Sequence, residues 1–254
     1  MKVLILAAGY GTRLKAIAEN TPKPLLPISN KPLINYIIGC VKGIPGLNEI
    51  VVVSNNKFFG QFQDWARALG AGVPVRVVND GSNSPEERLG SIGDIAFGIK
   101  DAGIQEDLLV VGGDNLFDFD LKAYISFARE KGRCVSIGAY DIGSIADAKL
   151  YGVLTLDAGG KITSFEEKPQ NPQSSLVSMC FYYFPASKLG LLTQYLNSSE
   201  KSDRAGDFIK WLTEKDAVYG FQFRGSWYDI GSVEAYHEAQ KKFKGDYKSS
   251  CTRL

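Results

Sequence analysis

Two cations and a glycine turn near the beginning of the sequence could bind a polyphosphate. An apolar run at residues 2–6 predicts a buried strand, and Gly9, Gly11 and Arg13 follow it. Glycine allows a positive φ and brings main-chain N–H groups close to phosphate oxygens. Lys23 stands between two prolines, which stiffen the chain and hold one cation in place. This combination indicates a site for a nucleoside triphosphate (NTP).

Two other glycine motifs do not fit this turn. A dinucleotide fingerprint, Gly-x-Gly-x-x-Gly, would need a third glycine where Leu14 stands, and a P-loop, Gly-x-x-x-x-Gly-Lys-Ser/Thr, does not occur here. The remaining alternative is an ordinary strand-to-helix turn in which glycine only supplies a positive φ. The proline-rich segment around Lys23 favours phosphate binding.

An acidic residue follows a second apolar run. Asp114 comes directly after residues 108–113, Leu-Leu-Val-Val-Gly-Gly, at the carboxyl end of a predicted buried strand. Ligands of open α/β sheets bind at this edge. A carboxylate there suits Mg²⁺, which takes one or two carboxylates besides water and phosphate oxygens. An Asp-Asn turn that only ends the strand is equally compatible with these residues.

Together these segments resemble one enzyme family. Residues 6–14, Leu-Ala-Ala-Gly-Tyr-Gly-Thr-Arg-Leu, and residues 22–27, Pro-Lys-Pro-Leu-Leu-Pro, closely resemble the sugar-phosphate nucleotidylyltransferases, also called nucleoside-diphosphate-sugar pyrophosphorylases. Glucose-1-phosphate thymidylyltransferases belong to this family, and the resemblance runs from Lys2 to about Phe243. It implies an enzyme that joins an NTP and a sugar 1-phosphate and releases pyrophosphate, with Mg²⁺ as cofactor.

The resemblance also assigns roles to individual residues. The metal ligands would be Asp114 and Asp229, the latter within residues 227–231, Trp-Tyr-Asp-Ile-Gly. The alternative for Asp229 is a cap on the next helix, but Ser232 is the better cap. The catalytic cations would be Arg13, Lys23 and Lys168. The nucleotide-binding residues would be Leu6, Ala7, Ala8, Gly9, Gly11, Thr12, Asn79 and Gly90, and the sugar-binding residues Tyr151, Gly152, Glu166, Glu167 and Arg204.

The sequence leaves open which of two glutamates meets the sugar. In the family, the glutamate directly before the lysine of Glu-Glu-Lys-Pro receives sugar hydroxyls, which corresponds to Glu167. In a regular strand, however, Glu166 and Lys168 share a face and Glu167 lies opposite. Either a bulge redirects the chain or Glu166 is the sugar contact, unless the run is only a solvated charged segment.

The sequence does not assign the nucleobase. Thymidylyl- and uridylyltransferases commonly carry a Gln and then Gly-Leu-Ala-Gln near the base. This chain has Asn79 and, from Leu89 onward, Leu-Gly-Ser-Ile-Gly. The second run also resembles the Leu-Gly-Thr-Ala-Gly of guanylyltransferases. Gly90 matches the base-contacting glycine.

The alternation of apolar patterns predicts an α/β fold. Strands are expected at 2–7, 49–54, 74–78, 107–112 and 133–140, and helices between them include 57–69, 92–101 and 119–131. This order favours a Rossmann-like three-layer α/β/α fold with a mixed, mainly parallel sheet. A β-hairpin at 151–166, with Asp-Ala-Gly-Gly at its turn, begins a hairpin-rich portion. The resemblance makes this portion the sugar-binding part.

One nucleotidyltransferase domain is expected for residues 1–254. It would contain a nucleotide-binding half at 1–145, a sugar-binding half at 146–244 and a polar tail at 245–254. Further strands are expected at 177–184 and 217–224, and helices at 186–196, 204–215 and 232–243.

Composition favours a globular cytoplasmic protein. The net charge of +1 provides no basic field for nucleic acid, and the short apolar run at 2–6 fits neither a signal peptide nor a membrane span. The cysteines form no CxxC pair, so we expect reduced thiols. The expected partners are an NTP and a sugar 1-phosphate, without nucleic acid or membrane, and a homo-oligomer stays open.

Two alternatives accompany this function. One is transfer of CMP to a non-sugar phosphate such as phosphocholine or an inositol phosphate. The other is a catalytically inactive nucleotide-binding regulatory homologue. The presence of Arg13, Lys23, Asp114, Lys168 and Asp229 argues against inactivity. The reaction needs no general base, because the phosphate nucleophile is already ionised at neutral pH.

Overall fold

A mixed sheet forms the centre of the protein. The computed structural model describes residues 1–202 and 204–243, so the predicted tail at 245–254 lies outside the described residues. In the described part, nine strands form one sheet in the order β10-β9-β11-β6-β1-β4-β5, and β8 pairs with β11 and β12. The predicted α/β fold with a mixed sheet is therefore confirmed.

The first half of the chain supplies parallel strands. β1 (Lys2–Leu6) pairs with β4 (Glu49–Ser54) on one side and with β6 (Leu108–Gly112) on the other, and β5 (Val75–Asn79) is the edge strand beside β4. β1 and β6 are almost completely buried and apolar, as expected for strands covered on both faces. Their carboxyl ends, Leu6 and Gly112, are therefore neighbours.

The second half continues the same sheet. β11 (Leu176–Phe184) runs antiparallel to β6 and to β8 (Val135–Asp141), and β12 (Val218–Phe223) runs parallel to β8. The predicted hairpin is present as β9 (Gly152–Leu156) and β10 (Ile162–Glu167). Gly160 in its turn has a φ of 81°, which is the conformation that the glycine-rich turn predicts.

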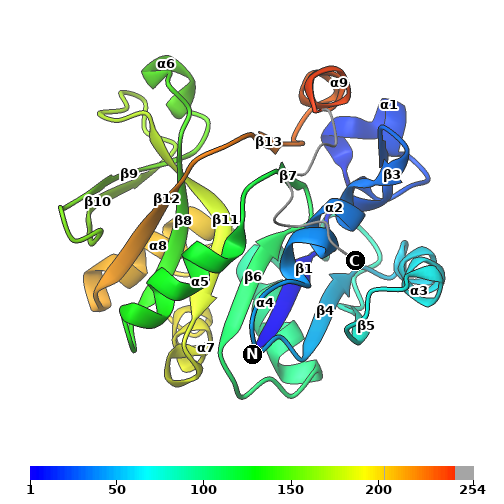
Figure 1. Cartoon of the computed structure of the whole chain (residues 1–254), viewed down its shortest axis with the longest axis horizontal. Coiled ribbons are helices and arrows are strands. Elements are labelled where there is room, and N and C mark those ends of the chain that lie inside the picture. Colours follow the sequence, from blue (N-terminus) through cyan, green and yellow to red (C-terminus); the bar gives the residue numbers. More distant parts are fainter. Residues whose placement is uncertain (203, 244–254) are drawn as a thin grey trace.

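Helices cover both faces of the sheet (Figure 1). One apolar core joins the sheet to α2 (Leu33–Val41), α3 (Phe59–Ala68), α5 (Leu121–Glu130) and α9 (Val233–Lys242). A second core on the other face joins it to α4 (Gly90–Asp101), α7 (Gly190–Leu196) and α8 (Ala205–Lys215). Successive residues of β1 alternate between the two cores, since Val3 and Ile5 belong to the first and Leu4 to the second.

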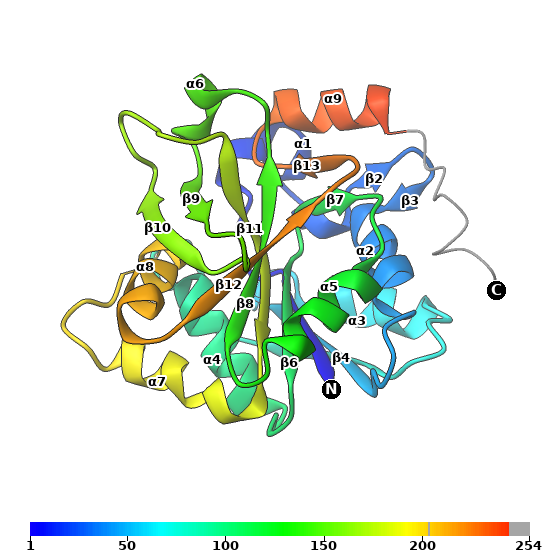
Figure 2. The same ribbon diagram turned by 60° about the vertical axis from the view of Figure 1, so that its left-hand side comes forward.

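Several short elements have no clear sequence signal. β7 (Asn115–Phe117) pairs antiparallel with β13 (Trp227–Asp229), and Figures 1 and 2 both show the two strands side by side near the start of α9. The other short elements are η1 (Thr12–Leu14), α1 (Lys15–Ala18), η2 (Lys23–Leu25), β2 (Pro27–Ile28), β3 (Lys31–Pro32), α6 (Ile145–Ala148) and η3 (Ala186–Lys188). The pairing of β7 with β13 joins two segments that are distant in the sequence.

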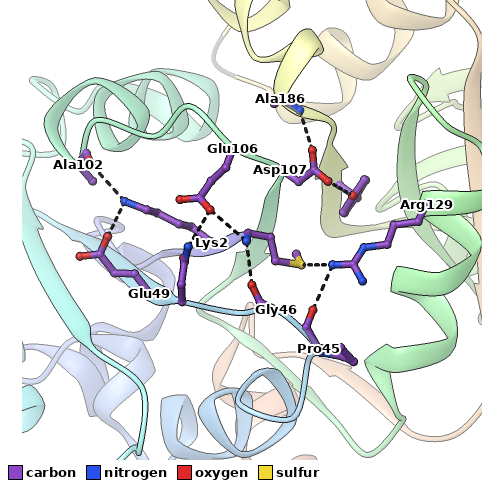
Figure 3. Close-up of polar contacts among 12 residues, drawn as sticks. Lys2, Pro45, Gly46, Glu49, Ala102, Glu106, Asp107, Arg129 and Ala186 are labelled. Carbon is purple, nitrogen blue, oxygen red and sulfur yellow. Dashed lines mark hydrogen bonds and ion pairs between the residues drawn. The ribbon is translucent and has the colours of Figure 1, made fainter.

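A layer of polar contacts lies at the amino ends of the parallel strands (Figure 3). The amino group of Met1 donates to the carbonyl of Gly46 at 2.8 Å, and Lys2 forms an ion pair with Glu49 at 2.7 Å. Arg129 donates to the carbonyl of Pro45 at 3.1 Å. These contacts use the polar groups at the amino ends of the parallel strands internally. The carboxyl ends are left as the edge where a ligand can bind.

No helix within residues 1–202 and 204–243 has both the length and the apolar character needed to cross a membrane.

The contact between α4 and the sheet predicts a stability effect. A Cβ added at Gly98 would overlap Leu4 Cδ1 and lie 2.9 Å from Val53 Cγ2, whereas a Cβ at Gly60 in α3 would meet nothing within 4 Å. Gly98→Ala should lower the free energy of unfolding by about 1–3 kcal/mol through overpacking. Gly60→Ala, the matched helix control, should leave it unchanged or raise it by up to about 1 kcal/mol. Urea denaturation measures both, and equal effects would contradict this packing.

Candidate active site

The loop after β1 is held by the neighbouring strand β4. The N–H of Ala7 donates to the carbonyl of Val53 at 2.9 Å, and the buried side chain of Asn55 donates through Nδ2 to the carbonyl of Ala8 at 2.9 Å. Gly11 has a φ of 63°, where glycine is favoured. The first turn of the loop is therefore fixed while Gly9 remains exposed.

A cavity of about 490 Å³ opens beside this loop at the carboxyl ends of β1 and β6. Of the predicted nucleotide-binding residues, Leu6, Ala8, Gly9 and Gly90 line it. Arg13 lines it as well. Ala7, Gly11, Thr12 and Asn79 are not among its lining residues; Asn79 instead donates to Asn56 at 2.9 Å.

The proline-rich segment directs Lys23 to the same place. Pro22 is extended, and the N–H of Leu25 donates back to its carbonyl at 2.8 Å, which closes the short helix η2. The Nζ of Lys23 lies 2.9 Å from Oδ2 of Asp114, and only 14% of the lysine side chain is exposed. Two segments that the sequence singles out separately thus form one ion pair.

Backbone pairing brings the two predicted metal ligands together. Asp229 stands opposite Asn115 in the ladder between β13 and β7, and the N–H of Ile230 donates to the carbonyl of Asp114 at 3.0 Å. Both aspartates line the cavity. A Cβ at Gly231 would lie 3.7 Å from Oδ2 of Asp229 and 3.9 Å from both terminal guanidinium nitrogens of Arg13. Arg13 and Asp229 therefore border the same glycine.

Burial and the neighbouring charges shift the pKa of both aspartates. Burial alone would raise the pKa of Asp114, but the ion pair and hydrogen bond with Lys23 outweigh it and hold the pKa below its usual value. Burial and the nearby charge of Asp114 raise the pKa of Asp229 to about 6, although Lys23, Arg13 and Lys168 act in the opposite direction. Two carboxylates with a mutual electrostatic effect and three cations nearby form a site for anionic ligands bound with a cation.

The two aspartates fit a magnesium site. They supply oxygen donors, which Mg²⁺ prefers, and the described residues contain no group of three or more His, Cys, Asp or Glu placed to hold a metal. Mg²⁺ commonly takes one or two carboxylates and completes its shell with water and phosphate oxygens. The donor set of Asp114 and Asp229 matches that chemistry.

The hairpin β9–β10 supplies the other wall of the cavity. Tyr151 and Gly152 line it, and so do Glu167 and Lys168. Lys168 has a φ of 49°, which is uncommon for a residue with a side chain, and its N–H donates to the carbonyl of Tyr151 at 3.0 Å. This local turn ends the alternation of the strand, so that Glu167 and Lys168 can border one cavity.

Two predicted sugar-binding residues lie elsewhere. Glu166 is exposed and is absent from the cavity wall, because it stands on the other face of β10 from Phe165 and Glu167. Arg204 is exposed directly before α8 and does not line the cavity, whereas Ala205 and Gly206 do. A Cβ at Gly206 would overlap the carboxylate of Glu167, so this glycine lets α8 approach the glutamate closely.

The cavity also contains residues that the sequence did not single out. They include Arg88, Asp94, Cys180, Tyr182, Asn115 and Trp227. Asn115 accepts from Trp227 Nε1 at 2.7 Å and donates to Asp114 Oδ1 at 3.1 Å, so it links β13 to the carboxylate of Asp114. Burial raises the pKa of the Cys180 thiol to about 12, which leaves it protonated and a poor nucleophile. No motif marks these positions, since they depend on which strands become neighbours.

Comparisons with known proteins identify the family of this chain. A family model described as nucleotidyl transferase matches residues 2–245. Bifunctional protein GlmU of Methanocaldococcus jannaschii is 28% identical over 243 residues, which are 95% of this chain and 54% of that protein. Glucose-1-phosphate adenylyltransferase of Fervidobacterium nodosum is 28% identical over 248 residues, which are 92% of this chain and 59% of that protein.

The chain spans a little more than half the length of these curated relatives. A solved structure of UDP-glucose pyrophosphorylase complexed with UDP-glucose matches with a TM-score of 0.79 and 24% identity, and covers 95% of this chain and 97% of that one. This likeness shows a shared fold. Because the family model covers nearly the whole chain, this protein belongs to the nucleotidyl transferase family.

Proposed function

We propose that this protein joins an NTP and a sugar 1-phosphate to form a nucleoside-diphosphate sugar and pyrophosphate. The observation that carries this proposal is the convergence of Asp114, Asp229, Lys23, Arg13 and Lys168 around one cavity at the carboxyl edge of the sheet. The family and the relatives support it. Residues 1–145 would bind the nucleotide and residues 146–244 the sugar phosphate, within a single domain.

The chemistry requires two anions to meet. An oxygen of the sugar phosphate attacks the α-phosphorus of the NTP in line, the bond to the bridging oxygen breaks, and pyrophosphate leaves with the electron pair. The protein must therefore align the reactants and neutralise their charge. Arg13 would hold the β- and γ-phosphates, Lys23 would stabilise charge that develops at the α-phosphate, and Lys168 would hold the sugar phosphate. Asp114 and Asp229 would bind Mg²⁺, which supplies positive charge to phosphate oxygens when bound.

Lys23 would have to exchange partners when the nucleotide binds. In the structure its ammonium is neutralised by Asp114 at 2.9 Å. A phosphate oxygen of the bound nucleotide would offer the Lys23 ammonium a second anionic partner. The ion pair would thus keep Lys23 close to its working position before the substrate arrives.

A panel assay tests the function itself. Release of pyrophosphate is measured for dTTP, UTP, GTP, CTP and ATP, each with glucose 1-phosphate, mannose 1-phosphate, N-acetylglucosamine 1-phosphate, phosphocholine and an inositol phosphate. We expect release with at least one sugar 1-phosphate. Release only from CTP with phosphocholine or the inositol phosphate would support the other transferase, and release from no pair would support an inactive homologue.

Removal of the Lys23 charge should slow the chemical step. Lys23→Ala should lower kcat by roughly 100-fold or more, which is typical for loss of a group that stabilises transition-state charge. Lys210→Ala, which removes an exposed lysine of α8, is the control and should leave kcat unchanged. Steady-state pyrophosphate release measures both variants. Nearly normal turnover of Lys23→Ala would contradict this role.

Activity should depend on a divalent cation and on Asp229. Treatment with EDTA should abolish pyrophosphate release, and added Mg²⁺ should restore it. Asp229→Asn should raise the Mg²⁺ concentration for half-maximal activity at least about tenfold, since loss of a charged ligand interaction weakens binding by about 1.5–3 kcal/mol. Asp101→Asn, at the exposed end of α4, is the matched control. An unchanged Mg²⁺ requirement in Asp229→Asn would refute the metal assignment.

The two adjacent glutamates give a paired test of the sugar site. Glu167→Gln should raise the KM for the sugar 1-phosphate about 10-fold, through loss of a hydrogen bond to a charged group, with a smaller change in the KM for the NTP. Glu166→Gln should change neither constant, because Glu166 is exposed and does not line the cavity. The reverse pattern would place the sugar on the other face of β10.

A further inference from the structure

Two buried carboxylate oxygens have no hydrogen-bond donor among the described residues. They are Oδ2 of Asp80, in the loop after β5, and Oδ1 of Asp94, in the second turn of α4. Only 8% of Asp94 is exposed, yet it lines the cavity next to Gly90 and Ser91. An ionised buried carboxylate without a partner is strongly unfavourable, so this pair needs an explanation.

The side chains of Asp80 and Asp94 share one proton in a hydrogen bond. They are in hydrogen-bond contact, and a hydrogen bond between two carboxyl groups requires that one is protonated. Oδ1 of Asp80 already accepts from the N–H of Ser82 at 2.7 Å and from its hydroxyl at 2.8 Å, which stabilises Asp80 as the ionised member. Asp94 is therefore the acid, and burial together with the charge of Asp80 raises its pKa to about 8.

A protonated Asp94 leaves one kind of contact for a ligand. Its O–H is directed to Asp80, so its second oxygen is a neutral acceptor at the wall of the cavity. Phosphate oxygens are mainly acceptors themselves, because most of them are deprotonated at neutral pH. The donors on an NTP are the N–H groups of its base and the hydroxyls of its ribose. A neutral acid can meet such a donor without adding a negative charge that would repel the triphosphate.

We propose that Asp94 binds the nucleoside part of the NTP as a neutral hydrogen-bond acceptor. Asp80 positions Asp94 by accepting a hydrogen bond from its O–H. This proposal rests on the proposed function, because it takes an NTP as the ligand. It assigns to Asp80 and Asp94 a role in substrate selection that the glycine loop and the catalytic cations do not supply. Asp80 acts only through Asp94 and is a positioning residue.

We assign a change in NTP affinity between pH 7 and pH 9 to the titration of Asp94. Toward α4, the strands β1 and β4 present apolar side chains such as Leu4 and Val53. The phenol of Tyr10 donates to Ser82, and burial raises its pKa above the ordinary value of 10. Arg88, Glu86 and Glu87 belong to the loop before α4, and a hydrogen bond with Ser84 holds the pKa of Glu86 below its usual value.

Equilibrium binding tests the proposal without relying on turnover. Dissociation constants are measured by calorimetry for UTP, dTTP, GTP, CTP and ATP, and for inorganic tripolyphosphate as a probe without a nucleoside. Asp94→Asn should bind the preferred NTP within twofold of the wild type, since an amide can donate to Asp80 and accept from the ligand just as the neutral acid does. Asp94→Ala should bind it about 5- to 10-fold more weakly, as expected for one lost hydrogen bond, and should bind tripolyphosphate normally.

The pH dependence separates the protonated acid from a carboxylate. Wild-type affinity for the NTP should fall about 5- to 10-fold between pH 7 and pH 9, as Asp94 loses its proton, and Asp94→Asn should show no such fall. This comparison does not need the Ala variant, whose fold is checked separately by its unfolding midpoint. A ribonucleotide and its 2′-deoxy counterpart then distinguish the donors: a loss in Asp94→Ala confined to the ribonucleotide indicates the 2′-hydroxyl, and an equal loss indicates the base or the 3′-hydroxyl.

Several outcomes would overturn the proposal. Asp94→Asn as weak as Asp94→Ala would show that Asp94 acts as a carboxylate, and normal binding by Asp94→Ala would show that it contacts no nucleoside. An equal loss of tripolyphosphate affinity would indicate a distorted loop instead. If an NTP binds with the expected pattern but no pyrophosphate forms, the proposed transferase activity fails and the assignment of Asp94 stands. If no NTP binds, both fail together.

Discussion

The site depends on one constraint: two like charges must be held side by side at the end of a buried sheet. Asp114 and Asp229 are brought together by the ladder between β7 and β13 and by the hydrogen bond from the N–H of Ile230 to the carbonyl of Asp114. Burial and the neighbouring charge of Asp114 together raise the pKa of Asp229. Lys23 opposes the repulsion between the two aspartates from a proline-stiffened segment, and Arg13 opposes it from the loop after β1. Backbone pairing fixes the positions of the aspartates. The positive charges of Lys23 and Arg13 offset the repulsion between them.

Close backbone approach gives the cavity its shape. A Cβ at Gly113 would lie 2.5 Å from the carbonyl oxygen of Leu6, and one at Gly112 would lie 3.1 Å from Asp114 Oδ1. A Cβ at Gly152 or at Gly206 would likewise come close to the carboxylate of Glu167 on the opposite wall. Side chains at Gly112, Gly152 and Gly206 would meet the carboxylates that border the cavity, and one at Gly113 would overlap the backbone at the end of β1. These four glycines are needed because there is no space for a side chain at their positions. The loop glycine Gly11 is instead favoured because of its positive φ.

The sequence predicts what depends on local pattern. The buried parallel strands, the hairpin with Gly160 and the motif positions of Asp114 and Lys23 all follow from apolar runs, turn residues and motif spacing. The sequence does not predict β7 and β13, because each has three residues and is stabilised only by its distant partner. The alternation rule placed Glu166 and Lys168 on one face, but the positive φ of Lys168 removes that relation. Asp94 lies within an ordinary helical pattern, and its role becomes visible only when Asp80 is its neighbour.

The charge balance of the cavity explains why a buried acid can be accommodated beside Gly90. Asp114, Asp229 and Glu167 already present three carboxyl groups to a cavity whose ligands are themselves anions. A further ionised carboxylate would oppose the attraction that Arg13, Lys168 and Arg88 provide around the cavity. The hydrogen bond to Asp80 removes this difficulty, because it places the negative charge in the loop after β5, where Ser82 stabilises it. The part of the cavity beside Gly90 thereby keeps a polar acceptor, and the charge that would repel the proposed triphosphate stays outside it.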